Sequence, residues 1–155
     1  MSKSLILMGS PADKEWCKKI ADELNKFGIE CEMRVASAHK VPEHTLNIIR
    51  SSNCDIIITV AGRSNALSGL TDGSTTKPVI ACPPLDGQNI LYDIYSTIRM
   101  PSGIAPLLVL TPENAALASA KIIGIKDENV RKRVEEYQKA QQKKLFDADK
   151  ELSNG

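Results

Sequence analysis

Short apolar runs alternate with amphipathic stretches along the first 110 residues of the chain. The apolar runs occupy residues 5–8, 29–36, 56–61, 79–82 and 107–110. Most of them are continuous, which is typical of strands that are buried on both faces of a parallel sheet. The stretches 13–27, 42–52 and 112–124 repeat apolar residues at three- and four-residue spacing, as amphipathic helices do. The pattern predicts a flavodoxin-like α/β domain, with a parallel sheet between two helical layers in an α/β/α arrangement.

Residues 127–155 differ from the rest because they are rich in charge yet keep an apolar stripe. Val130, Val134, Tyr137, Leu145 and Leu152 recur there at helical spacing. We expect one long helix, which either stays solvated on its own subunit or buries its stripe on a neighbour. We therefore interpret residues 1–126 as the α/β domain and residues 127–155 as a C-terminal helical arm of the same domain.

Composition and charge exclude several classes of protein. The 155 residues suit a single domain, and 20 Lys and Arg against 19 Asp and Glu leave a net charge of +1. Near-neutral charge, together with only one Trp, three Tyr and two Phe, argues against a nucleic-acid partner. No apolar stretch approaches the ~20 residues of a membrane helix, and no signal region precedes the first predicted strand. We expect a cytoplasmic protein that has no membrane contact.

The cysteines and histidines do not form a metal-binding pattern. Cys17, Cys31, Cys54 and Cys82 are scattered without a CxxC pair, and the chain has only two histidines. We therefore expect reduced, mostly buried thiols, with no metal and no cofactor.

Polar residues follow the first predicted strand, at the edge where open parallel sheets bind ligands. Gly9 permits a tight turn there, and the next helix begins with unpaired N–H groups that suit a phosphate. Ser10 adds a hydroxyl, and Asp13 is placed to cap the helix or to accept from a ribose hydroxyl. Plain helix capping also explains both side chains. Neither GxGxxG nor GxxxxGK[ST] is present, so the sequence supports no dinucleotide fold and no P-loop.

The second predicted strand is followed by the sequence Ser37-Ala38-His39-Lys40. Histidine is the natural acid/base near neutral pH, and lysine supplies a point charge for a carboxylate or phosphate. His39 is therefore the best acid/base candidate, although a lone loop histidine is more often a surface residue. His44 lies one turn into the following helix, and we interpret it as a surface residue.

Small and polar residues also follow the third predicted strand. The candidates there are Gly62, Arg63, Ser64, Asn65, Ser68 and Gly69. Such a loop lets backbone amides approach a ligand closely, and an ordinary polar loop is the alternative. Residues 82–85 (Cys-Pro-Pro-Leu) predict a rigid turn with a packed thiol. Residues 99–103 form a constrained loop, placed either to close over a ligand or to contact another subunit.

Five short motifs, in this order, resemble those of the PurE family of purine biosynthesis, which acts on aminoimidazole ribonucleotide. They are Met-Gly-Ser-x-x-Asp at 8–13, Ser-Ala-His-Lys at 37–40, Ala-Gly-Arg-Ser-Asn at 61–65, Arg-Met-Pro-Ser-Gly at 99–103 and Asn-Ala-Ala-Leu at 114–117. The resemblance covers residues 4–124, and the charged tail is similar to the family's C-terminal helix. One departure is Ala12, which stands where the family commonly has a second Ser.

The family has two branches, and the resemblance favours one of them. The mutase branch, which rearranges N5-carboxyaminoimidazole ribonucleotide, typically carries Ser-Ala-His-Arg and a second histidine in Ala-Gly-Gly-Ala-Ala-His. Here Lys40 replaces that arginine, and residues 63–65 (Arg-Ser-Asn) replace the glycine-rich segment with its histidine. Cys-Pro-Pro at 82–84 is also similar to the branch that carboxylates aminoimidazole ribonucleotide directly with CO2. The resemblance therefore implies the direct carboxylase, without ATP or biotin.

The resemblance also implies roles for the residues at the strand ends. His39 would move the proton, and Lys40, with backbone amides of residues 62–69, would hold CO2 or the new carboxylate. The substrate contacts would come from Gly9, Ser10, Asp13, Ser37, Ala38, Gly62, Arg63, Ser64, Asn65, Ser68 and Gly69. A homo-octamer or another homo-oligomer is implied, with sites near subunit boundaries.

Two other functions remain open from the sequence. The first is the mutase reaction on the same fold. The second is a non-catalytic module that binds a nucleotide or phosphate for regulation, in which His39 would have no chemical role.

Overall fold

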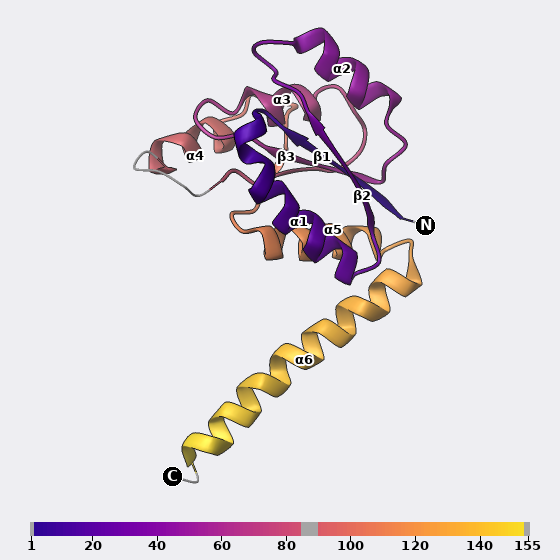
Figure 1. Ribbon diagram of the computed structural model, residues 1–155, viewed down its shortest axis with the longest axis vertical. Helices are drawn as coiled ribbons and strands as arrows, with labels where there is room; N and C mark the ends of the chain where they lie inside the picture. The colour runs from indigo at the N-terminus through magenta and orange to yellow at the C-terminus, as the bar shows by residue number, and fades with distance from the viewer. Residues whose placement is uncertain (1, 85–89, 154–155) are drawn as a thin grey trace.

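The computed structural model describes residues 2–84 and 90–153, which include a five-stranded parallel sheet (Figure 1). The strands are β1 (Lys3–Met8), β2 (Glu30–Val35), β3 (Ile56–Val60), β4 (Val79–Ala81) and β5 (Leu107–Leu108). Their order in the sheet is β2-β1-β3-β4-β5, and every neighbouring pair is parallel. The chain builds outward from β1 to β2 and then crosses back to β3. The topological switch point, where such sheets bind ligands, therefore lies between β1 and β3.

Helices cover both faces of this sheet. They are α1 (Lys14–Lys26), α2 (Pro42–Ser51), α3 (Ala66–Asp72), α4 (Ile90–Ile98), α5 (Pro112–Ile123) and α6 (Glu128–Ser153), with a short 3₁₀ helix, η1 (Pro11–Asp13). Figure 1 shows α1 and α5 on one side of the sheet and α2 and α3 on the other. The predicted three-layer α/β/α architecture is confirmed.

Burial on two faces explains why the central strands are continuously apolar. Along β1, Ile6 and Met8 pack into the core beneath α1 and α5, whereas Leu5 and Leu7 pack into the core beneath α2 and α3. Strand β3 alternates in the same way, with Ile57 opposite to Ile56 and Ile58. Each such buried side chain contributes roughly 1.5–3 kcal/mol relative to exposure. These two strands therefore anchor the loops that follow them.

Strand β2 differs from the buried strand that the sequence predicted at residues 29–36. It lies at the sheet edge, and its residues are exposed except for the half-buried Cys31. The charged residues Glu30, Glu32 and Arg34 alternate along it. Charges on an edge strand discourage pairing with a second sheet, which explains why this strand is less apolar than β1 or β3.

The sequence predicts neither α3 nor α4. The polar loop expected over residues 62–69 is helical from Ala66 onward. Helix α3 is short and includes Gly69, so neither length nor propensity marks it in the sequence. Packing of Leu67, which is buried, stabilises it instead. Helix α4 follows residues 85–89, so Leu85 of the predicted Cys-Pro-Pro-Leu turn lies outside the described residues.

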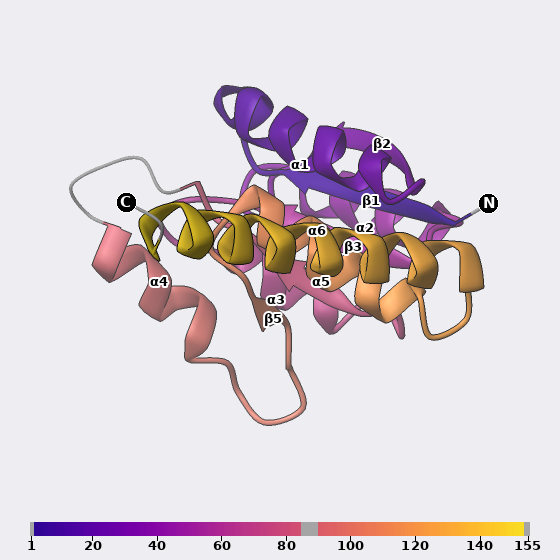
Figure 2. The same cartoon turned by 90° about the horizontal axis from the view of Figure 1, so that it is seen from below.

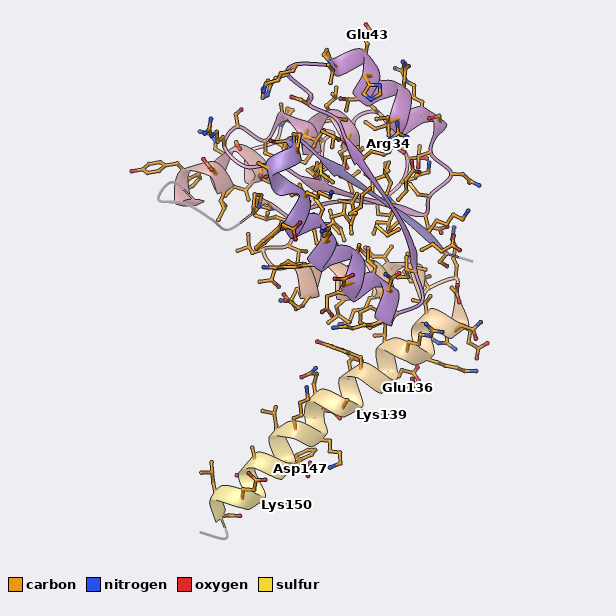
Figure 3. All side chains as sticks on the ribbon, in the orientation of Figure 1. Arg34, Glu43, Glu136, Lys139, Asp147 and Lys150 are labelled. Carbon is orange, nitrogen blue, oxygen red and sulfur yellow. The ribbon has the colours of Figure 1, made fainter. Side chains whose placement is uncertain are left out.

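Helix α6 is attached to the domain only through its first turns. Val130 and Val134 are buried, and the ring of Tyr137 meets Phe27 edge-on at 5.5 Å between centroids. At its start, the Asp127 carboxylate accepts from the Val130 N–H and the Ser2 hydroxyl, and the Ser2 bond lowers the pKa of Asp127. Figure 1 shows the rest of the helix extending away from the domain. Figure 3 shows Glu136, Lys139, Asp147 and Lys150 along this length.

Within residues 2–84 and 90–153, no helix has both the length and the hydrophobicity of a membrane span.

Candidate active site

The loops that follow β1, β2 and β3 meet at the carboxyl edge of the sheet. The Gly9 N–H donates to the Val60 carbonyl at 2.8 Å, and the Ala36 N–H donates to the Met8 carbonyl at 2.9 Å. A Cβ at position 9 would lie 3.4 Å from the Cβ of Ala61, in van der Waals contact, so the first and third loops approach each other closely here. The structure therefore brings together the three segments that the sequence predicted to form the site.

The first loop positions Ser10 and Asp13 at the start of α1. The Ser10 hydroxyl accepts from the Ala12 N–H at 3.2 Å and caps η1, as the capping interpretation predicted. Asp13 makes no capping bond with its side chain to α1. Gly9, Ser10 and Asp13 are all half-buried, so each keeps part of its surface open to a ligand at this edge.

The second loop holds His39 and Lys40 in a turn that Ser37 stabilises. The Ser37 hydroxyl accepts from the Lys40 N–H at 3.3 Å, and the Ser37 carbonyl accepts from the Val41 N–H at 3.0 Å. Both His39 and Lys40 have exposed side chains. Neither the imidazole nor the ammonium group has a hydrogen-bond or ion-pair partner among residues 2–84 and 90–153. Both groups are therefore available to a ligand.

The third loop contains an unusual backbone conformation at Arg63. Its φ of 58° lies in the left-handed region, and no other non-glycine residue in the described chain has a positive φ. This conformation costs roughly 1–3 kcal/mol and persists only where surrounding contacts enforce it. Arg63 and Ser64 are exposed, so both side chains are open to solvent at the same edge as His39.

Asn65 and Ser68, which the sequence predicted as ligand contacts, are buried inside the protein. The Asn65 side chain accepts from the Ser68 N–H at 3.1 Å and donates to the Thr97 hydroxyl at 2.9 Å. Gly69 lies within α3, where a Cβ would be 3.2 Å from the Met100 sulfur. These residues build the loop in this structure, and their contact with substrate stays a prediction.

Three residues of α4 belong to this edge and were missed from the sequence. Asp93, Ser96 and Thr97 hydrogen-bond to the loop at Arg63 and Asn65. Figure 2 shows α4 at the end of the sheet away from the N-terminus, in agreement with Figure 1. In the sequence, only the polar residues on one face of the otherwise apolar α4 mark this role. They do not show that the partner is the loop at Arg63 and Asn65, some thirty residues earlier.

Within the described part of the chain, no three His, Cys, Asp or Glu side chains gather in a way that would hold a metal ion. The edge instead offers one imidazole, two cationic side chains and several hydroxyl and backbone groups. This set can hold an anionic small molecule and exchange one proton with it.

Comparison with known proteins identifies the family. The model of the family described as AIR carboxylase matches residues 3–144, which include all three loops. The chain belongs to the AIR carboxylase family. It is 53% identical over 152 residues to a phosphoribosylaminoimidazole carboxylase of Archaeoglobus fulgidus, a match that covers 97% of this chain and 84% of that protein.

Two further relatives extend this result. An N5-carboxyaminoimidazole ribonucleotide mutase of Methanocaldococcus jannaschii is 40% identical, with 95% of each chain covered. The crystal structure of Treponema denticola PurE superimposes with a TM-score of 0.94 at 43% identity, and the match covers 98% of this chain and 99% of that one. The PurE resemblance read from the motifs is confirmed, and the family includes members named for either reaction.

We predict that the thiols of Cys17 and Cys82 do not react in the native protein. Burial raises the pKa of each thiol from 9.0 to about 12. Because the thiolate is the nucleophile, roughly one thiol in ten thousand is reactive at pH 8. Iodoacetamide should modify neither residue before denaturation and both after it, as measured by mass spectrometry. Rapid native labelling of Cys82 would contradict a packing role.

The raised pKa values of Cys17 and Cys82 also determine how the stability of the folded state changes with pH. The folded pKa of about 12 exceeds the ordinary value of 9.0, so the native state retains these protons longer than the unfolded chain. The contribution to stability is complete below pH 9 and is lost as the pH rises toward 12.

Proposed function

We propose that this chain carboxylates 5-aminoimidazole ribonucleotide (AIR) directly with CO2, giving 4-carboxy-5-aminoimidazole ribonucleotide without ATP or biotin. The observation that carries the proposal is the imidazole of His39, which has no hydrogen-bond partner among the described residues and lies beside Lys40 at the switch-point edge of the sheet. Family membership and the name of the Archaeoglobus relative support this reaction. The chain is thus an enzyme that acts on a small ribonucleotide.

The nucleotide's phosphate and ribose are held by the first two loops in this proposal. Gly9 and Ser10 lie before the N-termini of η1 and α1, where the helix dipole and the remaining backbone N–H groups favour an anion. The Gly9 and Ala12 N–H groups already donate within the protein. Asp13 accepts from a ribose hydroxyl, and Ser37 and Ala38 border the same edge. Binding energy at these non-reacting groups places carbon 4 of the imidazole against CO2, a substrate too small to be held tightly by itself.

The chemistry needs one proton acceptor. The 5-amino group makes carbon 4 of AIR nucleophilic, and carbon 4 attacks the carbon of CO2. A carbon–carbon bond forms, and one electron pair of CO2 becomes the carboxylate charge. Carbon 4 is then tetrahedral and still carries its hydrogen. Neutral His39 removes that proton, the C–H electrons restore the aromatic ring, and the imidazolium returns the proton to solvent.

In this proposal, side chains rather than backbone amides stabilise most of the charge on the new carboxylate. Backbone amides of residues 62–69 were expected to share this role, but the N–H groups of Arg63, Asn65 and Ser68 already donate within the protein. Lys40 and the exposed Ser64 hydroxyl remain available at the edge. A cation placed where charge develops lowers the barrier most when water is excluded.

The mutase reaction is the second candidate, because a 40% identical relative carries that name. The mutase-type motif has a second histidine in the loop after β3, where this chain has Arg63, Ser64 and Asn65. The only other histidine, His44, lies on α2 and is exposed. This difference favours direct carboxylation.

We predict a substrate preference that separates the two reactions. Purified enzyme given AIR and CO2 without ATP should form the 4-carboxylated product, measured by its ultraviolet absorbance. N5-carboxyaminoimidazole ribonucleotide should be a poor substrate under the same conditions. Because CO2 and not bicarbonate is attacked, reactions started with dissolved CO2 should begin faster than those started with bicarbonate. The reverse substrate preference would assign the chain to the mutase branch.

We predict that His39→Asn folds like wild type but loses roughly 10²–10⁴-fold in turnover, because the variant lacks the imidazole that accepts the proton in this proposal. The chain's other histidine supplies a matched control, since His44→Asn removes an exposed imidazole that lies on α2. This control should retain near-wild-type rates. Circular dichroism checks that both variants fold. Equal turnover in the two variants would remove the acid/base role from His39, whereas a wild type that binds AIR without converting it would favour the non-catalytic regulatory module.

We further propose that the enzyme is a cytoplasmic homo-oligomer, an octamer by family resemblance, in which α6 contacts a neighbouring copy. Leu145, Phe146 and Leu152 are 73%, 65% and 84% exposed on α6. On α4, Tyr92, Tyr95 and Ile98 are also exposed. Clusters of large exposed apolar side chains are typical of subunit interfaces. The four free cysteines fit a reducing compartment, and subcellular fractionation tests this location.

We predict that Leu145→Lys lowers the mass of the assembly. Light scattering should give a wild-type mass several times the 16.9 kDa of one chain, and the variant should shift toward 16.9 kDa. Gln142→Lys, which adds the same charge at an exposed polar position of α6, should leave the assembly unchanged. A monomeric wild type would contradict the proposal.

A further inference from the structure

The strained conformation at Arg63 is held by one helix through both of its peptide groups. The Arg63 N–H donates to the Asp93 carboxylate at 2.9 Å, and the Arg63 carbonyl lies 3.1 Å from the Ser96 hydroxyl. Asp93 and Ser96 are three residues apart on α4 and therefore lie on the same face of that helix. Rotation about Arg63 toward an ordinary φ would disrupt these bonds.

The Ser96 hydroxyl also ties down the next part of the loop. Its oxygen accepts from the Asn65 N–H at 2.9 Å. A hydroxyl has one proton, and here that proton serves either the Arg63 carbonyl or the Asp93 carbonyl, which lies 2.8 Å away. Removing this one oxygen would leave the Asn65 N–H without its acceptor and the Arg63 carbonyl without a donor.

These bonds fix the backbone but leave the end of the Arg63 side chain unoccupied. The side chain is exposed, and its guanidinium has no hydrogen-bond or ion-pair partner among the described residues. The loop follows β3, which is next to β1 in the sheet, so Arg63 shares the edge at which His39 and the first loop lie. A guanidinium at this edge suits oxyanions, which it can bind through two parallel hydrogen bonds.

We infer that Asp93 and Ser96 are positioning residues, which hold Arg63 in its left-handed conformation so that its guanidinium binds an anionic oxygen group of the ribonucleotide. The inference rests on the proposed function for the identity of the substrate. The anionic group is either the phosphate, present throughout the reaction, or the carboxylate, which forms during it. Asp93 and Ser96 act through Arg63 and touch no reacting atom.

The test combines Asp93→Ala with Arg63→Ala in a double-mutant cycle of AIR carboxylation. Each single variant should lose roughly 10- to 100-fold in kcat/KM, because a misplaced contact group costs about this much. In the Arg63→Ala background, the further loss from Asp93→Ala should shrink to a few-fold at most, since the two act as a unit. Ser96→Ala should behave like Asp93→Ala.

The kinetic parameters distinguish the two anionic groups. If Arg63 binds the phosphate, the loss should appear as a higher KM for AIR with kcat little changed. If it binds the forming carboxylate, kcat should fall at saturating AIR. Either pattern supports the positioning role, and each assigns a different partner to the guanidinium.

Two controls separate positioning from general destabilisation. Asp93→Asn keeps an oxygen that can accept from the Arg63 N–H, so it should restore most of the activity lost in Asp93→Ala. Asp55→Ala removes a carboxylate that accepts from the Lys3 N–H at 2.8 Å, a bond of the same kind at the opposite edge of the sheet. It should leave kcat/KM unchanged. Hydrogen exchange of the peptide covering residues 61–68 should quicken in Asp93→Ala and not in Asp55→Ala.

The experiments distinguish a failure of the proposed AIR carboxylation from a failure of the positioning role of Asp93 and Ser96. A wild-type enzyme that does not carboxylate AIR overturns the proposed function. A wild type that turns over, with an Asp93→Ala variant of equal kcat/KM, overturns only the positioning role. Fully additive losses in the double variant overturn it as well, because Asp93 would then act independently of Arg63. Should Asp93→Ala fail to fold, Ser96→Ala carries the same cycle.

Discussion

Strand β1 is the element on which the rest of the molecule depends. It is paired with β2 on one side and with β3 on the other, and side chains on both of its faces are buried. Parallel pairing brings the carboxyl ends of all three strands to one edge. Burial fixes the register of β1 and β3, because a one-residue slip would turn every buried side chain to the wrong face. The loops with Gly9, His39 and Arg63 therefore meet at this edge, and α4 holds the Arg63 loop there.

The sequence predicts what depends on local pattern. Continuous apolar runs marked β1 and β3, and a proline at the first helical position marked α2 at Pro42. It does not predict features that depend on distant partners. The left-handed conformation of Arg63 needs acceptor and donor groups on α4, and nothing near Arg63 in the sequence specifies them. Asn65 shows the same limit, because a polar residue after a strand is equally suited to bind a ligand or to cap α3.

Few ionisable groups lie at the carboxyl edge of the sheet, which is consistent with the net charge of +1. An anion does not require a basic protein when it is held by local amides, one lysine and one arginine. The chemistry proposed for His39 needs a single proton acceptor, and an exposed turn keeps that imidazole accessible. Thiols, by contrast, are kept out of the chemistry by burial, as the raised pKa of Cys82 indicates.

The distal part of helix α6 depends on local interactions for its helical structure. Past Tyr137 it packs on nothing in its own described chain, so on a single subunit its helical state rests on local pairs such as Lys143 with Asp147. An isolated helical segment of this length is marginal in water, and salt weakens such pairs. On a single subunit, the distal arm is thus a region where ionic strength decides how much of the chain is helical.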